Sequence, residues 1–136
     1  MDRKQILEFL NLNPVCHLST LEDGRPRVRG MFMYRADEQG LLFHTASSKS
    51  LAGQVADGAP VEVCFNDSDT QIRVSGTVEV VADPAIRQEI VSSRPFMQPW
   101  VRKYGFDLLK VFRVKNCSAA VWTVDRNFEP TTYQPL

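Results

Sequence analysis

The chain has 136 residues, of which 43% are hydrophobic, and sixteen basic residues balance sixteen acidic ones. This length and composition predict one folded domain and not a disordered chain. A formal net charge of zero excludes a nucleic-acid binder that depends on a broadly basic surface, while a small basic pocket stays compatible with it.

Neither a membrane span nor a metal site is expected. No apolar run reaches the roughly 18 residues of a spanning helix, and residues 1–10 have no apolar core of a signal peptide. We therefore expect a cytoplasmic protein with no membrane partner. The cysteines Cys16, Cys64 and Cys117 are far apart in the sequence, and only His17 and His44 could join them as ligands. We expect three reduced, buried thiols.

The first half of the chain predicts a helix followed by a three-stranded antiparallel meander. Asp2 can cap the helix, and Asn13-Pro14 ends it. Alternating apolar residues separated by turn-forming residues indicate the strands. The expected elements are a helix over residues 2–11 and strands over residues 15–20, 25–35 and 41–45. A further helix, capped by Ser47 or Ser48, should run to about residue 57.

The second half predicts four more strands and one helix. The strands cover residues 61–66, 71–82, 108–114 and 118–124, and the helix covers residues 85–93 after an Asp83-Pro84 start. Gly76, inside a strand, indicates a bulge or a close backbone approach. Residues 94–106 and the tail 125–136 show no clear element. The pattern predicts a mainly β protein, an antiparallel barrel with helical inserts, as a single domain over residues 1–136.

A phosphate site is the best supported chemical feature. Arg29 lies in the middle of a strand, where an inward guanidinium needs an anion. Ser48 and Lys49 lie at the expected start of a helix, where free backbone N–H groups attract anions, and Thr45 ends the preceding strand. The alternative stays open at this point: an exposed edge-strand arginine, an ordinary helix cap and a solvated lysine would give the same pattern.

No catalytic acid, base or nucleophile follows from the residues. The two histidines lie in strands without a visible base partner, and the glycines form no Walker or dinucleotide fingerprint. Trp100, Tyr104 and Phe106 could form the wall of a ligand site, the core or a dimer contact.

The ordered set of segments resembles the pyridoxamine 5′-phosphate oxidase-like family of FMN-binding split barrels. These segments are P-R-V-R-G-M, L-L-F-H-T, S-S-K, Q-I-R-V-S-G-T-V-E and D-P-A-x-R, and they span roughly residues 5 to 95. The resemblance implies a six-stranded antiparallel Greek-key split β-barrel. It also implies a homodimer with two FMN sites at the subunit interface.

The resemblance also implies the cofactor-binding positions. Arg29 would contact the phosphate, and Gln71 would come from the partner subunit. The full set is Arg29, Gly30, Met31, Phe32, Met33, Tyr34, His44, Thr45, Ser48, Lys49 and Gln71. Two of them depart from the family pattern, because Ser48 replaces an arginine and Tyr34 replaces the lysine of the biosynthetic oxidase. The tail contains only Arg126 and no histidine, which argues against pyridoxamine phosphate oxidation.

We therefore expect an FMN-binding homodimer, a flavin-dependent oxidoreductase that acts on a small molecule. NADH and NADPH are the candidate electron donors. Three alternatives stay open: a non-catalytic flavin-binding or sensing module, a related split barrel that binds haem or a deazaflavin, and a cofactor-free dimer in which Arg29 and Lys49 are solvated.

Overall fold

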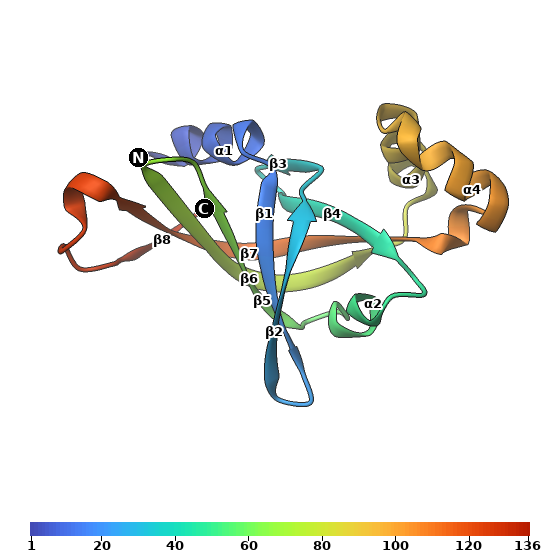
Figure 1. Ribbon diagram of the computed structural model, residues 1–136, viewed down its shortest axis with the longest axis horizontal. Coiled ribbons are helices and arrows are strands. Elements are labelled where there is room, and N and C mark those ends of the chain that lie inside the picture. The colour runs from blue at the N-terminus through green and yellow to red at the C-terminus, as the bar shows by residue number, and fades with distance from the viewer.

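An antiparallel sheet of eight strands dominates the computed structural model, which describes residues Met1–Leu136 (Figure 1). The strands are β1 Val15–Glu22, β2 Arg25–Phe32, β3 Arg35–Asp37, β4 Gly40–Ala46, β5 Pro60–Asn66, β6 Thr70–Val81, β7 Leu109–Thr123 and β8 Tyr133–Pro135. Their order is β2-β1-β5-β6-β7-β4-β3, and β8 pairs with β7. The mainly β prediction is confirmed. The expected count of six strands is too low, because the three-residue strands β3 and β8 add to six longer ones.

Four α-helices accompany the sheet: α1 Arg3–Leu12, α2 Ser50–Gln54, α3 Pro84–Ser93 and α4 Gln98–Tyr104. Short 3₁₀ helices cover Pro95–Met97, Phe106–Leu108 and Val124–Arg126. Asp2 and Gln5 form a capping box on α1, and the Asp83 side chain caps α3 just before Pro84. These two helix starts confirm the sequence prediction. No helix combines the length and the apolar character that crossing a bilayer requires.

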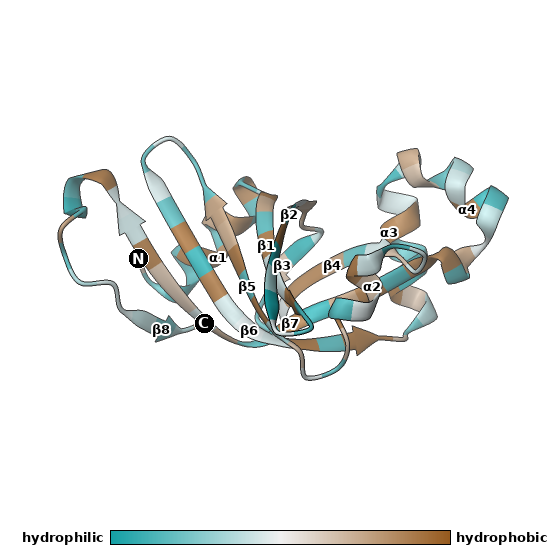
Figure 2. Cartoon of the chain, turned by 60° about the horizontal axis from the view of Figure 1, so that its bottom comes forward, coloured by the Kyte–Doolittle hydropathy of each residue, from teal (hydrophilic) through white to brown (hydrophobic).

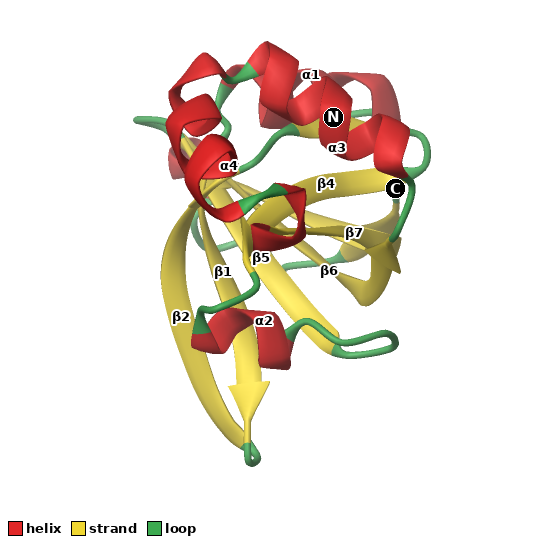
Figure 3. Ribbon diagram, turned by 90° about the vertical axis from the view of Figure 1, so that its right-hand side faces the viewer, coloured by secondary structure: helices red, strands yellow, loops and turns green.

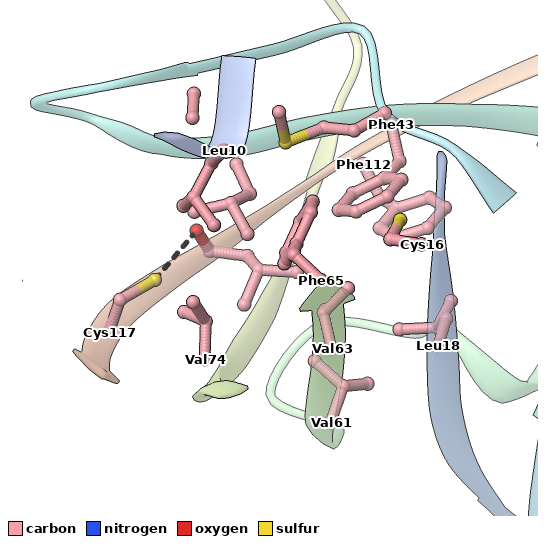
Figure 4. Close-up of a cluster of buried hydrophobic side chains, with 14 of the residues drawn as sticks. Leu10, Cys16, Leu18, Phe43, Val61, Val63, Phe65, Val74, Phe112 and Cys117 are labelled. Atoms are coloured by element: carbon pink, nitrogen blue, oxygen red, sulfur yellow. Dashed lines mark hydrogen bonds between the residues drawn. The ribbon is translucent and has the colours of Figure 1, made fainter. Parts of the chain in front are cut away.

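The main core lies between the sheet and α1. Alternate residues of the longer inner strands point inward, so that side chains such as Phe43, Phe65 and Phe112 are fully buried, together with Leu10 of α1 (Figure 4). The same alternation is visible as apolar and polar bands along the strands in Figure 2. Phe43 of β4 stacks on Phe112 of β7 with ring centroids 5.4 Å apart.

A second apolar cluster lies on the other face of β4. Leu42 packs there with Ile90 and Val91 of α3, Met97 and residues of β6 and β7. Strand β4 is therefore buried on both faces, with Phe43 toward the main core and Leu42 toward α3. Because side chains alternate, His44 shares the face of Leu42 and points toward the α3 end of the molecule.

The predicted meander of the first three strands is wrong. The stretch expected as one strand over residues 25–35 divides into β2 and β3, and these two strands lie at opposite ends of the sheet order. The break falls at Met33 and Tyr34. The Met33 N–H donates to Pro14 O beside β1, whereas the Tyr34 N–H donates to Leu42 O of β4. The chain thus crosses from one edge of the sheet to the other at these residues.

The helix expected over residues 48–57 with a serine cap is also corrected. Helix α2 covers only Ser50–Gln54, and Lys49 stands at its N-cap without a side-chain hydrogen bond. The Lys49 N–H donates to Ala46 O, so a turn comes before the helix and leaves Ser48 exposed.

The two final strands expected over residues 108–114 and 118–124 are one continuous strand, β7. The pairing with β6 shifts register between Ser75 and Thr77, and Asn116 of β7 has a φ of 55°. Asparagine tolerates this left-handed conformation, so the strand continues through the irregularity. The bulge predicted at Gly76 is confirmed, and so is the close approach: an added Cβ would lie 2.6 Å from Lys115 O.

The two segments without predicted elements both contain regular structure. Residues 95–108 contain two of the 3₁₀ helices and α4, and the C-terminal segment contains the third 3₁₀ helix and strand β8. Tyr133 of that strand donates a hydrogen bond to Glu62, whereas Phe128 is 98% exposed. The tail and α4 lie at opposite ends of the molecule (Figure 1).

Candidate functional site

A pocket of about 400 Å³ lies between β2, β4, Lys49 and the segment that leads into α4. Helices α4 and α2 lie at the same end of the molecule, with the strands behind them (Figure 3). The lining residues are Gly30, Met31, Phe32, His44, Thr45, Ala46, Lys49, Arg94, Phe96, Met97, Trp100, Val101, Leu108 and Leu109. Nine of these fourteen residues are hydrophobic, two are cations and none is a carboxylate. Such a lining favours a largely apolar ligand that carries negative charge.

Strand β2 supplies one side of the pocket. Met33, just after the strand, is buried, so Gly30 and Phe32 face away from the core by alternation. A Cβ on Gly30 would have no atom within 4 Å, because the space beside this residue is open. The backbone of β2 is therefore accessible to a ligand at this position.

Arg94 is the buried cation of the site. It stands between α3 and the next 3₁₀ helix, and Pro95 excludes it from helical geometry, so its φ and ψ are −123° and 77°. Its guanidinium donates from Nη1 to Phe32 O at 3.2 Å and from Nη2 to Met33 O at 2.8 Å. It also lies over the Phe32 ring, 4.2 Å from the centroid. None of the ion pairs in the chain includes Arg94.

His44 contacts Arg94 directly, with Nε2 only 2.6 Å from Nη1. Because a guanidinium has no acceptor and is always protonated, Nε2 of His44 must be the acceptor. Burial, together with the positive charges of Arg94 and Lys49, lowers the pKa of His44 from 6.5 to about 4. His44 is therefore a neutral hydrogen-bonding group of the pocket at neutral pH.

The structure brings six of the eleven expected cofactor residues together in the pocket lining: Gly30, Met31, Phe32, His44, Thr45 and Lys49. The other five lie outside the lining. Met33 is buried in the core. The Tyr34 hydroxyl donates to Glu89 of α3, and Ser48 is exposed.

Arg29 and Gln71 lie apart from the lining for different reasons. Arg29 donates to Gln54 Oε1 at 3.0 Å, and Gln54 also accepts from Thr20. The guanidinium is thus tied to the end of α2. Gln71 is in β6, opposite Asn66 and Trp122.

Sequence reasoning missed Arg94 and left the role of the aromatic segment open. Phe96, Met97 and Trp100 line the pocket, whereas Tyr104 and Phe106 do not. The available signal was the Arg-Pro dipeptide after α3, since a proline disfavours helical backbone geometry in the residue before it and so ends the helix at Arg94.

The sequence model of the family described as pyridoxamine 5′-phosphate oxidase matches residues 2–121. The chain belongs to this family. The expected resemblance is thereby confirmed over most of its length. No curated protein sequence matches the chain.

Several solved structures share this fold. A nimC/nimA family protein from Clostridium acetobutylicum has a TM-score of 0.77 at 20% identity, with 98% of this chain and 92% of that chain covered. A protein from Mycobacterium smegmatis that binds FAD and haem has a TM-score of 0.69 at 18% identity, with 99% and 82% covered. A second C. acetobutylicum protein, related to general stress protein 26 and described as pyridoxinephosphate oxidase family, has a TM-score of 0.71 at 14% identity, with 100% and 97% covered. At these identities the likeness establishes the fold.

Proposed function

We propose that this member of the pyridoxamine 5′-phosphate oxidase family is a homodimeric, FMN-dependent oxidoreductase with a small-molecule substrate. The observation that carries the proposal is the pocket itself. It combines an apolar lining, two cations and no carboxylate with six of the positions expected to bind the cofactor. A protein of this fold from M. smegmatis binds FAD and haem, which makes a flavin a reasonable ligand for this pocket too.

The pocket fits FMN by size and by donor chemistry. Its volume of about 400 Å³ lies in the range of small-molecule sites. The open space beside Gly30 would accommodate a flat ring against the β2 backbone. Lys49 has no carboxylate partner in the chain and could compensate a phosphate.

In this proposal Lys49, Thr45 and Arg29 hold the phosphate end. Arg29 uses one of its five N–H groups on Gln54, which leaves others for an anion. The backbone of Gly30 to Phe32 would line the ring, and Gln71 would come from the partner subunit. Bound FMN would supply the electron transfer, and the protein would orient the ligands and exclude water.

Haem is a weaker candidate because of the contact between His44 and Arg94. His44 is the only histidine of the lining, and its Nε2 already accepts from Nη1 of Arg94 at 2.6 Å. A haem iron would have to displace this hydrogen bond to use that nitrogen. The mass and the absorbance spectrum of the ligand bound to the freshly purified protein distinguish FMN, deazaflavin and haem.

The decisive experiment is cofactor extraction followed by titration of FMN into the stripped protein. We expect FMN to bind, and the Arg29→Ala/Lys49→Ala double variant to bind at least about 10-fold more weakly, since two charge-assisted contacts are lost. Arg27→Ala/Lys103→Ala is the matched control, because both residues are exposed and outside the pocket lining. Unchanged FMN affinity in the first double variant would refute the assigned phosphate end.

Catalysis is tested separately from binding. Anaerobic addition of NADH or NADPH to the FMN-loaded protein should bleach the flavin absorbance. If neither donor bleaches it while FMN stays tightly bound, the non-catalytic flavin-binding module is the better description.

A further inference from the structure

The pocket wall opposite β2 is a segment with few buried side chains of its own. We define the wall segment as residues 95–104, which contain the first 3₁₀ helix and α4. Helix α4 has no buried residue, and Phe96 and Trp100 are 55% and 53% exposed. Their rings meet edge to face at a centroid distance of 6.2 Å. Of the apolar side chains in the segment, only Met97 is buried.

Arg94 is the polar attachment that precedes this segment. Its guanidinium contacts two different parts of the sheet: Phe32 O and Met33 O at the end of β2, and His44 Nε2 on β4. Its backbone carbonyl accepts from the Met97 N–H at 3.0 Å. The same residue thus joins the start of the wall segment to both strands that form the opposite side of the pocket.

The contacts match the geometry of a guanidinium and not merely its charge. Nη1 meets two acceptors and Nη2 meets a third, while the planar group lies 4.2 Å from the Phe32 ring centroid and 5.2 Å from that of Tyr34. A lysine ammonium could not reproduce this planar, multiply bonded arrangement. All three acceptors are uncharged, so the cation is satisfied by hydrogen bonds instead of an ion pair.

We propose that Arg94 is a positioning residue that fastens the wall segment across the pocket by bridging the end of β2 and His44. The inference concerns the pocket of the proposed function and depends on that function only for the identity of the ligand. Without the guanidinium, the wall segment would keep buried Met97 and partly buried Val101 as its apolar contacts and would open more often. A ligand held under Phe96 and Trp100 would then leave faster.

Hydrogen exchange measured on the protein as purified, without added FMN, tests the fastening directly. In Arg94→Met, amides of residues 96–104 should exchange about 10-fold faster or more, because several charge-assisted hydrogen bonds are lost. Amides of β5 and β6 should be unchanged. Arg94→Lys should lose most of the protection as well. Arg102→Met is the matched control, since Arg102 is an exposed cation of α4 whose side-chain hydrogen bond goes to Gln98 of the same helix.

Equal exchange of residues 96–104 in Arg94→Met and wild type would overturn the proposal, and so would full protection in Arg94→Lys. If Arg94→Met does not fold, His44→Leu removes one acceptor only and should still raise exchange in the wall segment several-fold. No rise there would equally overturn the proposal.

A second readout separates positioning from direct ligand contact. In the FMN-loaded protein, Arg94→Met should release FMN faster with unchanged binding capacity. If Arg94→Met weakens binding of FMN or inorganic phosphate while the wall segment keeps its protection, Arg94 contacts the ligand itself and the fastening role is wrong. Absence of FMN binding in the wild type would refute the proposed function and leave the exchange experiment valid.

Discussion

His44 accepts a hydrogen bond from Arg94 through Nε2 at 2.6 Å, although fifty residues separate the two in the chain. Since Nε2 provides the lone pair, the proton of the neutral ring must be on Nδ1. Protonation of Nε2 would replace this attraction with two facing cations. The contact therefore holds His44 in one tautomer and penalises its charged form.

Stability should fall in mild acid because of this penalty. The pKa of His44 is lowered to about 4 in the folded protein, mainly by burial and then by Arg94 and Lys49, against 6.5 for the free side chain. Between these two values the unfolded chain binds a proton that the folded chain does not. Stability is therefore lost as pH falls from about 6.5 to about 4 and is independent of this group above that window. The loss from His44 reaches up to about 3 kcal/mol.

Urea denaturation of wild type and His44→Gln at several pH values measures this effect. The glutamine can accept from Arg94 but does not titrate, so the variant should show a shallower acid loss. His17→Gln is the control, since His17 is exposed and lies in β1. Parallel pH profiles for wild type and His44→Gln would contradict the assignment.

Local chemistry predicted most of the elements, and long-range pairing decided the rest. Asp2, Asp83-Pro84 and Gly76 each carry a signal within a few residues, and the structure confirms all three. The break at Met33 carries no such signal, because it arises where the chain changes its partner from β1 to β4. Alternating apolar residues show which strands exist and not which strands pair.

The sequence indicated those pocket residues that lie on segments close to one another in the chain. Gly30, Thr45 and Lys49 belong to the ordered set of short segments that carried the family resemblance, and all three line the pocket. Arg94 was not found, since its importance depends on α3 returning to the face of β4 that carries His44. Its Arg-Pro dipeptide indicates the end of a helix but not which carbonyl groups and which histidine the guanidinium meets in the fold.

Gly30 should control access to the pocket without affecting stability. A Cβ at this position meets no atom within 4 Å, and the residue lines the pocket. We therefore expect Gly30→Val to leave the urea midpoint unchanged or slightly raised, since valine suits a strand. The same variant should weaken FMN binding about 10-fold or more by filling ligand space.

The control for this prediction is Gly53→Ala, which also meets no atom within 4 Å but lies in α2 outside the lining. It should bind FMN normally. Normal FMN affinity in Gly30→Val would show that the ligand does not lie against β2.

Gly76 should behave in the opposite way, with a stability cost. An added Cβ would lie 2.6 Å from Lys115 O and 2.7 Å from Val114 Cγ1, in the tightly packed bulge between β6 and β7. Gly76→Ala should lower the free energy of unfolding by about 1–3 kcal/mol, as overpacked positions do. Gly53→Ala serves again as the control and should be neutral or stabilising by up to about 1 kcal/mol. A neutral Gly76→Ala would mean that the bulge adjusts freely.

Mixing of subunits tests whether Gln71 acts in the partner's site. Lys49 lines the pocket of its own chain, whereas Gln71 lies outside it on β6. If each site combines Lys49 of one subunit with Gln71 of the other, both Lys49→Ala and Gln71→Ala homodimers should bind FMN weakly. Co-refolding the two variants in equal amounts should restore tight binding to about one quarter of all sites, because half of the dimers are mixed and each mixed dimer has one intact site.

Wild type co-refolded with the Lys49→Ala/Gln71→Ala double variant is the matched comparison, and its mixed dimers should contain no intact site. In that comparison only the wild-type homodimers, about a quarter of the dimers, keep intact sites, so about one quarter of all sites should again bind tightly. If both residues serve the same subunit, the first mixture should contain no intact site and the second should contain intact sites in about half of its subunits. Measuring FMN capacity in each mixture therefore decides between the arrangements.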